Sequence, residues 1–162
     1  MADRIFITLG SQKFQFNRLL KAVDELCAKG ILTGEIFAQT GYSDYVPEHY
    51  RWQAFLNRDE FAEETGKADI VITHGGTGAI IGAVKKRKKV IAVPRRAKYG
   101  EHVDDHQLQL VEQFRELNLI CECDDPDRLA EALETVRNTE YREYKSNTQT
   151  IIQSISKFIE EL

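Results

Sequence analysis

Short apolar runs alternate with longer segments of helical spacing along the whole chain, and this alternation limits the folds open to it. Most of the runs are apolar on both faces, as in parallel sheets that carry helices on each side. The sequence therefore predicts an α/β fold with a doubly wound, mostly parallel, six-stranded sheet. The expected strands are residues 4–9, 35–40, 50–56, 69–73, 89–93 and 119–122.

Segments with apolar residues three and four positions apart fill the intervals between these strands. A length of 162 residues suits one domain, which is expected to span residues 1–162. The last expected helix carries an apolar stripe that either packs on its own domain or docks on another chain. The expected helices are residues 16–29, 58–67, one that follows Gly78 and ends at about Lys86, 103–117, one that opens at Asp125 and Pro126, and about 140–162.

The composition excludes several classes of protein. A net charge of -4 gives the chain no reason to bind nucleic acid. No apolar run approaches the roughly 18 residues of a membrane span, and the first residues do not resemble a signal peptide. Three cysteines are an odd number, which argues against a disulfide framework and favours a reducing, cytoplasmic setting. We interpret Cys121 and Cys123 as thiols of a buried strand in preference to metal ligands.

A glycine-rich loop, His74 to Gly78 (HGGTG), comes directly after the fourth expected strand. Gly75, Gly76 and Gly78 let the backbone approach a ligand closely, and Thr77 is expected to cap the helix that follows. Free N–H groups and the dipole at a helix start bind anions, and the His74 ring can donate to a phosphate oxygen. The loop therefore predicts a phosphate site, and the alternative is a glycine-rich turn without a ligand.

Two familiar phosphate motifs are absent from the sequence. The loop is not a P-loop, because no lysine directly follows the glycines. The loop after the first strand, Gly10-Ser11-Gln12, lacks the second and third glycines of a dinucleotide fingerprint. An NAD-dependent enzyme on the same fold is therefore a weak alternative.

A third polar loop, residues 98–107, is expected at the same edge of the sheet, beyond the carboxyl ends of the strands. Asp105 and Gln107 offer donors and acceptors suited to sugar hydroxyls, although acidic residues also favour a helix start. His102 and His106 are four residues apart and could form a metal pair, but no third ligand is placed beside them. We therefore predict no metal site.

The order of these loops resembles a known family. A GSQ loop after the first strand, HGGTG after the fourth and DHQ after the fifth are similar to the C-terminal half of glycosyltransferase family 28. The stand-alone form of that half is the better match, as in the soluble subunit of the dolichol-linked UDP-GlcNAc transferase and in bacterial exopolysaccharide transferase subunits. The resemblance covers nearly the whole chain and implies a Rossmann-like single lobe of a GT-B glycosyltransferase.

The resemblance also implies roles for individual residues around a UDP-sugar donor. Gly10, Ser11 and Gln12 would lie beside the diphosphate, and the backbone of Phe55 beside the uracil. His74 and the backbone of Gly75, Gly76, Thr77 and Gly78 would hold the phosphates, with His74 stabilising the leaving group. Glu101, His102, Asp105, His106 and Gln107 would belong to the donor loop, the last three facing the sugar. Arg95, Arg96 and Lys98 lie near this edge and would help to neutralise a diphosphate.

One position departs from the family pattern. Related enzymes carry a glutamate for the ribose hydroxyls eight residues after the histidine, where this chain has Gly82. The departure supports a second hypothesis, a non-catalytic nucleotide-binding or regulatory module on the same fold.

Glycosyl transfer of this type needs a donor lobe and an acceptor lobe, and the chain is long enough for one. The resemblance implies a membrane-associated partner that supplies the acceptor site and the catalytic base. The expected activity is inverting transfer of a hexose or N-acetylhexosamine to a lipid-linked saccharide in surface or exopolysaccharide synthesis. The chain would then work at the inner face of the membrane through its partner, without a cofactor. The basic run Lys85–Lys89 either contacts anionic lipid or forms a solvated helix end.

Overall fold

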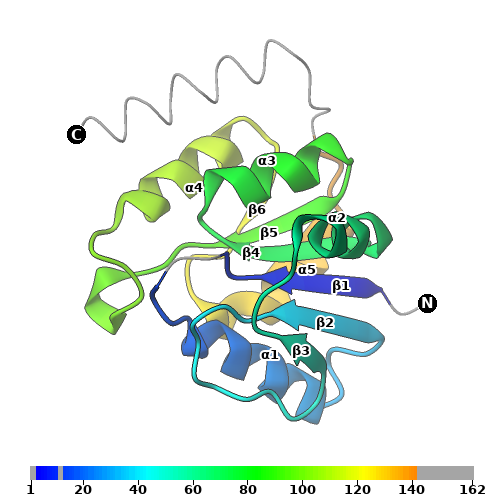
Figure 1. Ribbon diagram of the computed structural model, residues 1–162. Coiled ribbons are helices and arrows are strands. Elements are labelled where there is room, and N and C mark those ends of the chain that lie inside the picture. Colours follow the sequence, from blue (N-terminus) through cyan, green and yellow to red (C-terminus); the bar gives the residue numbers. More distant parts are fainter. Residues whose placement is uncertain (1–2, 11–12, 142–162) are drawn as a thin grey trace.

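Six strands form one parallel sheet in the computed structural model, which describes residues 3–10 and 13–141. Their order is β3-β2-β1-β4-β5-β6, and each neighbouring pair runs parallel (Figure 1). This confirms the predicted α/β fold. The strands are β1 (Arg4–Thr8), β2 (Glu35–Gln39), β3 (Arg51–Gln53), β4 (Ile70–His74), β5 (Lys89–Val93) and β6 (Cys121–Glu122).

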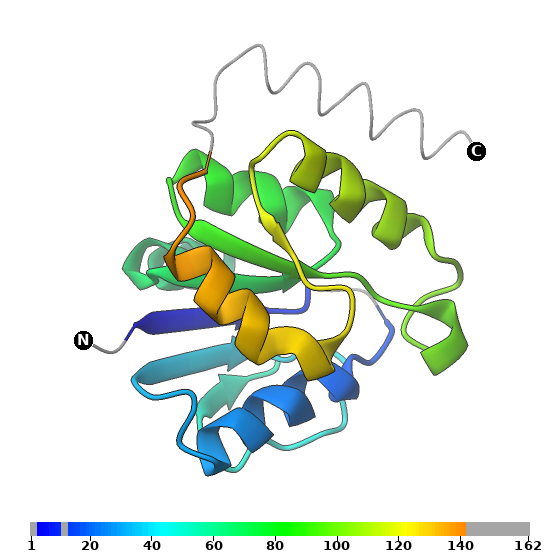
Figure 2. The ribbon, with the colours of Figure 1, turned by 180° about the vertical axis from the view of Figure 1, so that it is seen from behind.

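Helices cover both faces of the sheet, which is why the central strands are apolar on both sides. Ile5 and Ile7 of β1 pack toward α1 and α5, whereas Phe6 between them packs toward α2, α3 and α4 (Figures 1 and 2). In the described part of the chain, no helix is both long and apolar enough to span a bilayer. The helices are α1 (Asn17–Ala28), α2 (Arg58–Lys67), α3 (Thr77–Lys85), α4 (His106–Glu116) and α5 (Leu129–Arg137).

The strand order places two loops side by side. The sheet continues in one direction from β1 to β3 and in the other from β4 to β6, so the order reverses between β1 and β4. Thr8 pairs with Thr73 at the carboxyl ends of these two strands, and the Thr73 hydroxyl donates to the Thr8 carbonyl at 3.1 Å. Ligands of open α/β sheets bind at such a reversal. The loops that follow Thr8 and His74 therefore share one edge.

The third strand and the helix predicted at 103–117 are shorter in the structure than in the prediction. The third strand covers only 51–53, because this edge strand is exposed and pairs on one side. The helix predicted at 103–117 begins at His106, since the preceding residues form a 3-10 turn at Ala97–Tyr99 and an irregular loop. The C-terminal helix predicted at about 140–162 lies outside the described residues from position 142 onward.

The basic run that ends at the first residue of β5 donates hydrogen bonds to carbonyls of two helices. Lys88 donates through Nζ to the Gly66 carbonyl of α2 at 2.8 Å, and Lys89 donates to the Arg137 carbonyl of α5 at 2.9 Å. Lys86 reaches the Ala62 carbonyl at 3.0 Å. The last carbonyls of a helix have no partner inside the helix and attract cations. These contacts give the lysines a structural role at the amino edge of the sheet.

Candidate functional site

His74 ends β4 with its ring enclosed between two glycines. The side chain is 5% exposed. A Cβ atom added at Gly10 would lie 2.6 Å from Nε2 of His74, and one added at Gly76 would lie 2.8 Å from the same atom. Gly10 also adopts a φ of +71°, which L side chains rarely adopt. Only glycine at both positions lets the ring present Nε2 toward the loop after β1.

The other edge of the His74 ring faces Gln107 in the first turn of α4. Nε2 of Gln107 lies 3.5 Å from Nδ1 of His74, and Oε1 of Gln107 accepts the main-chain N–H of Arg95 at 3.2 Å. The pKa of His74 is lowered to about 3, chiefly by burial and then by the charge of Arg95. The ring is therefore neutral at neutral pH and acts as a hydrogen-bond donor rather than a cation.

The start of α3 adjoins the same ring. Gly76 is the N-cap in extended backbone, and no described side chain caps this helix start. Thr77 is the first helical residue, so the expectation that it caps α3 is wrong. A Cβ atom at Gly75 would lie 2.7 Å from Cβ of Gln107, so this glycine lets α4 pack close to the loop. At Gly78 an added Cβ would meet open space. The first N–H groups of α3 are thus suited to an anion.

Arg95 follows β5 and holds the loop after β1 from beneath. Its guanidinium, in a residue only 1% exposed, donates to the carbonyls of Leu9 at 2.6 Å and Phe14 at 2.9 Å. Longer bonds reach the carbonyls of Gln15 and Glu101, both at 3.3 Å. Burial lowers the pKa of Arg95 to about 10, which leaves it charged at neutral pH. The sequence suggested that Arg95 neutralises a diphosphate, but its Nη1 and Nη2 donate to loop carbonyls, and its buried Nε has no hydrogen-bond partner among the described residues.

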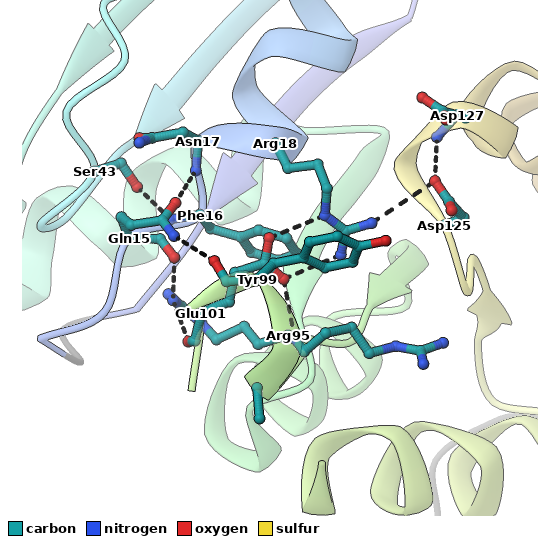
Figure 3. Close-up of polar contacts among 12 residues, drawn as sticks. Gln15, Phe16, Asn17, Arg18, Ser43, Arg95, Tyr99, Glu101, Asp125 and Asp127 are labelled. Carbon is teal, nitrogen blue, oxygen red and sulfur yellow. Dashed lines mark hydrogen bonds and ion pairs between the residues drawn. The ribbon is translucent and has the colours of Figure 1, made fainter. Parts of the chain in front are cut away.

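Glu101 joins the same framework. Its carboxylate is 1% exposed and accepts a bidentate pair of bonds from Arg18 of α1, at 2.9 and 3.0 Å (Figure 3). The Arg96 main-chain N–H donates to Oε1 of Glu101 at 2.9 Å. Arg18 in turn lies over the Tyr99 ring at 4.3 Å, and Gln15 donates to the Tyr99 carbonyl at 3.0 Å. The Glu101 side chain therefore joins α1 to the loop after β5 and has its oxygens occupied by protein donors.

The remaining residues of the predicted donor loop lie around Asp104 and the start of α4. Asp105 accepts the Ala97 main-chain N–H at 3.0 Å. Nδ1 of His102 and Nδ1 of His106 both face Asp104, at 3.4 and 3.5 Å. Within residues 3–10 and 13–141 there is no cluster of three or more histidine, cysteine or acidic side chains that could hold a metal ion. The His106 side chain is 42% exposed, and the neighbouring Asp105 is exposed as well.

A pocket of about 280 Å³ lies on the other side of Gly10 and is lined by Gln39, Phe55 to Arg58 and Phe61. Phe55 lies two residues after β3 and is 47% exposed. Its ring makes an edge-on contact with the Tyr42 ring, with the two ring centroids 5.2 Å apart. Gln39 donates to the Gly10 carbonyl at 3.0 Å and is almost fully buried. Gly10 lines this pocket and also lies against the His74 ring, so the pocket and the ring are neighbours across Gly10.

Sequence reasoning missed Gln39. The sequence signal for it was a polar residue at the end of a strand whose three preceding residues are apolar. Oε1 of Gln39 accepts the Thr8 hydroxyl at 2.8 Å, and Nε2 of Gln39 also donates to the Ala54 carbonyl at 2.9 Å. Gln39 thereby holds the ends of β1 and β3 in register with Gly10. Two predicted site residues, Ser11 and Gln12, lie outside the described residues. A larger cavity of about 700 Å³ at the amino edge of the sheet contains none of the predicted site residues.

Known proteins are similar to this chain in sequence and in fold. The human UDP-N-acetylglucosamine transferase subunit ALG13 is 26% identical over 117 residues, which is 68% of this chain and 10% of that protein. An NMR solution structure of ALG13 has a TM-score of 0.64 at 16% identity and covers 99% of this chain and 98% of that one. The glycotransferase of kitacinnamycin has a TM-score of 0.63 at 16% identity, over 98% of this chain and 39% of that one.

The chain thus spans about a tenth of the curated relatives that it matches, and the solved structures establish its fold as that of one lobe of GT-B glycosyltransferases. Residues 4–162 match the family described as the glycosyltransferase family 28 C-terminal domain, which is nearly the whole sequence. Because this match covers nearly the whole sequence, the chain belongs to the glycosyltransferase family 28 C-terminal domain family.

Proposed function

We propose that this chain is the donor-binding, catalytic subunit of a two-component inverting glycosyltransferase that uses a UDP-sugar. The observation that carries the proposal is the neutral His74 ring, whose Nε2 faces Gly10 beside the uncapped start of α3. A neutral donor and several main-chain N–H groups at one point match a pyrophosphate better than a cation or an apolar ligand.

These neighbouring features account for the parts of such a donor. The diphosphate lies at the start of α3, beside the loop that carries Gly10, and the Nε2–H of His74 donates to it. The pocket beside Phe55 takes the uracil, within reach of the Phe55 backbone. Asp105 and His106, at the start of α4, lie toward the transferred sugar. Donor candidates are therefore UDP-hexoses and UDP-N-acetylhexosamines, and Gly82 leaves the ribose to other groups.

The chemistry follows from where charge develops. An acceptor hydroxyl attacks the anomeric carbon of the sugar while the bond from that carbon to the diphosphate oxygen breaks, with inversion. The leaving UDP gains negative charge, which the α3 amides and the Nε2–H of His74 stabilise by hydrogen bonds already in place. No metal or other cofactor is needed for this role. The acceptor proton passes to a base that the second subunit supplies.

The proposed partner is a membrane-associated protein that carries the acceptor site. The human relative is named as a subunit of a UDP-N-acetylglucosamine transferase, which supports assembly with a second protein. The structural neighbour from kitacinnamycin synthesis is a longer chain of which this fold covers 39%. We extend the proposal to a lipid-linked saccharide acceptor in surface or exopolysaccharide synthesis, reached at the cytoplasmic face of the membrane. Residues 140–162 are the proposed docking segment.

Calorimetric titration with UDP tests the donor site. We expect wild-type protein to bind UDP and His74→Ala to bind it roughly 10- to 100-fold more weakly, because one bond to a charged group contributes about 1.5–3 kcal/mol. His49→Ala is the control, since His49 pairs with Asp24 on the far side of α1 and lies outside the site. Circular dichroism checks that each variant folds. No UDP binding by the wild type, or equal binding by His74→Ala, would contradict the proposal.

A second candidate, a nucleotide-binding module without turnover, is favoured by Gly82. An added Cβ there would meet open space, so the fold itself does not exclude the glutamate that related enzymes carry. A transfer assay with a lipid-linked acceptor separates the two functions. UDP binding with no transfer in the presence of the membrane partner would favour the module. Transfer that requires both proteins would favour the enzyme.

A further inference from the structure

The amide of Gln107 has only one consistent orientation. The main-chain N–H of Arg95 is an obligatory donor, and it lies 3.2 Å from the outer amide atom of Gln107. That atom must therefore be the carbonyl oxygen Oε1. The amide nitrogen Nε2, which can only donate, then faces His74 at 3.5 Å from Nδ1. Both side chains are buried, at 6% and 5% exposed, so the arrangement is shielded from water.

This orientation decides which nitrogen of His74 carries the proton. A donor facing Nδ1 requires a lone pair there, because two N–H groups cannot point at each other. Burial keeps the ring neutral, and the positive charge of Arg95 acts in the same direction, as does the ring of His102. A neutral ring has a single proton, which must then be on Nε2. Nε2 is also the atom that lies against Gly10 and Gly76.

We propose that Gln107 is a positioning residue that fixes the His74 tautomer, so that Nε2–H points at the phosphate position beside the start of α3. A chain of donors runs from the Arg95 main chain through Gln107 to His74 and ends at the ligand. With the other tautomer, Nε2 would present a lone pair to a phosphate oxygen and repel it. The phosphate part of this inference rests on the proposed function, whereas the tautomer is a property of the free protein.

The same geometry changes the role that the sequence suggested for Gln107. Its amide was expected to face the hydroxyls of the sugar. In the structure Oε1 is engaged by the main chain, and Nε2 is directed at Nδ1 of His74. Gln107 therefore acts on the donor through His74 and is distinct from Asp105 and His106 of the same DHQ motif.

Nitrogen-15 NMR of the histidine rings in the full chain without ligand tests the tautomer. The signal of His74 is assigned by its loss in His74→Gln, since the chain has 4 histidines. We expect long-range proton–nitrogen correlations to show a protonated Nε2 and an unprotonated Nδ1 that persist from pH 6 to pH 8. A proton on Nδ1 of the wild-type protein would overturn the proposal.

Gln107→Glu replaces the donor that faces Nδ1 of His74 by an acceptor and keeps nearly the same side-chain shape. One carboxylate oxygen still accepts the Arg95 N–H, but the other now presents an acceptor to Nδ1, so we expect Nδ1 of His74 to become protonated. Gln109→Glu is the matched control, because Gln109 is exposed on the same helix and should leave the His74 spectrum unchanged. An unprotonated Nδ1 in a folded Gln107→Glu protein would refute the role of Gln107.

Addition of UDP to the wild-type protein then tests the phosphate part. We expect the Nε2 resonance to shift while Nε2 keeps its proton and Nδ1 changes little. Bound UDP with no change at Nε2 would overturn the contact between His74 and phosphate. If UDP does not bind at all, the proposed donor function fails, whereas the tautomer measured without ligand stands on its own.

Discussion

Replacing Arg95 by methionine is expected to lower the free energy of unfolding by about 3–5 kcal/mol, the range for breaking one side of a buried charged network. The guanidinium is buried and holds together the carbonyls of Leu9, Phe14 and Gln15 in the loop after β1. Methionine fills a similar volume but leaves those acceptors without their donor, and a buried unpaired acceptor is costly. Urea unfolding followed by circular dichroism measures the change.

Arg96→Met is the matched control for this experiment. Arg96 is the adjacent residue, and its guanidinium makes an exposed bond to the Asp124 carbonyl at 3.4 Å. Its loss should cost less than about 1 kcal/mol, as is usual for a surface contact. We also expect amide hydrogen exchange in residues 13–16 to accelerate in Arg95→Met and not in Arg96→Met. Equal destabilisation by the two variants would show that Arg95 is not the clamp of this loop.

Replacing Gly10 by alanine is expected to weaken UDP binding on the order of 100-fold, which corresponds to about 2.7 kcal/mol. The added Cβ would lie 2.6 Å from Nε2 of His74, a separation that real Cβ atoms essentially never show. Either the ring must rotate away from the proposed phosphate position or the loop must move outward. In both cases the donor hydrogen bond of His74 and the α3 amides no longer converge. Calorimetry with UDP gives the affinity.

Gly30 offers a control with the same backbone and without the clash. It adopts a φ of +72°, against +71° at Gly10, but an added Cβ would meet nothing within 4 Å. Gly30→Ala should therefore carry the left-handed strain of about 1–2 kcal/mol and leave UDP affinity unchanged. The difference in UDP affinity between the two alanine variants therefore measures the effect of the contact with His74. If both variants bind UDP like the wild type, the ring is not held against Gly10 for ligand binding.

The Arg95 and Gly10 variants test two different contacts of the loop after β1. Arg95 holds the loop after β1 in place, and Gly10 lets that loop approach the His74 ring. Arg95→Met is expected to act first on stability, whereas Gly10→Ala is expected to act first on binding. Residues that share a network do not contribute additively. The loss of UDP-binding free energy in the double variant should therefore be smaller than the sum of the losses in the two single variants.

Much of this protein could be predicted from local pattern. The apolar runs that became β1, β2, β4 and β5 follow directly from residue type, because a buried parallel strand must be apolar on both faces. The helix that follows the HGGTG loop was also predictable and is confirmed, whereas the phosphate site expected at its start stays a prediction. These features depend on residues that are close along the chain, so the local sequence pattern is enough to predict them.

The tertiary structure decided which distant residues meet and which polar groups remain available to a ligand. Arg18 and Glu101 are 83 residues apart, yet their pairing removes Glu101 from the set of ligand-facing side chains. Gln107 meets His74 only because β4 and α4 pack together through Gly75. A polar residue looks equally available in any sequence. Only the packed structure shows whether its hydrogen bonds are already made, because burial leaves each donor and acceptor a single set of partners.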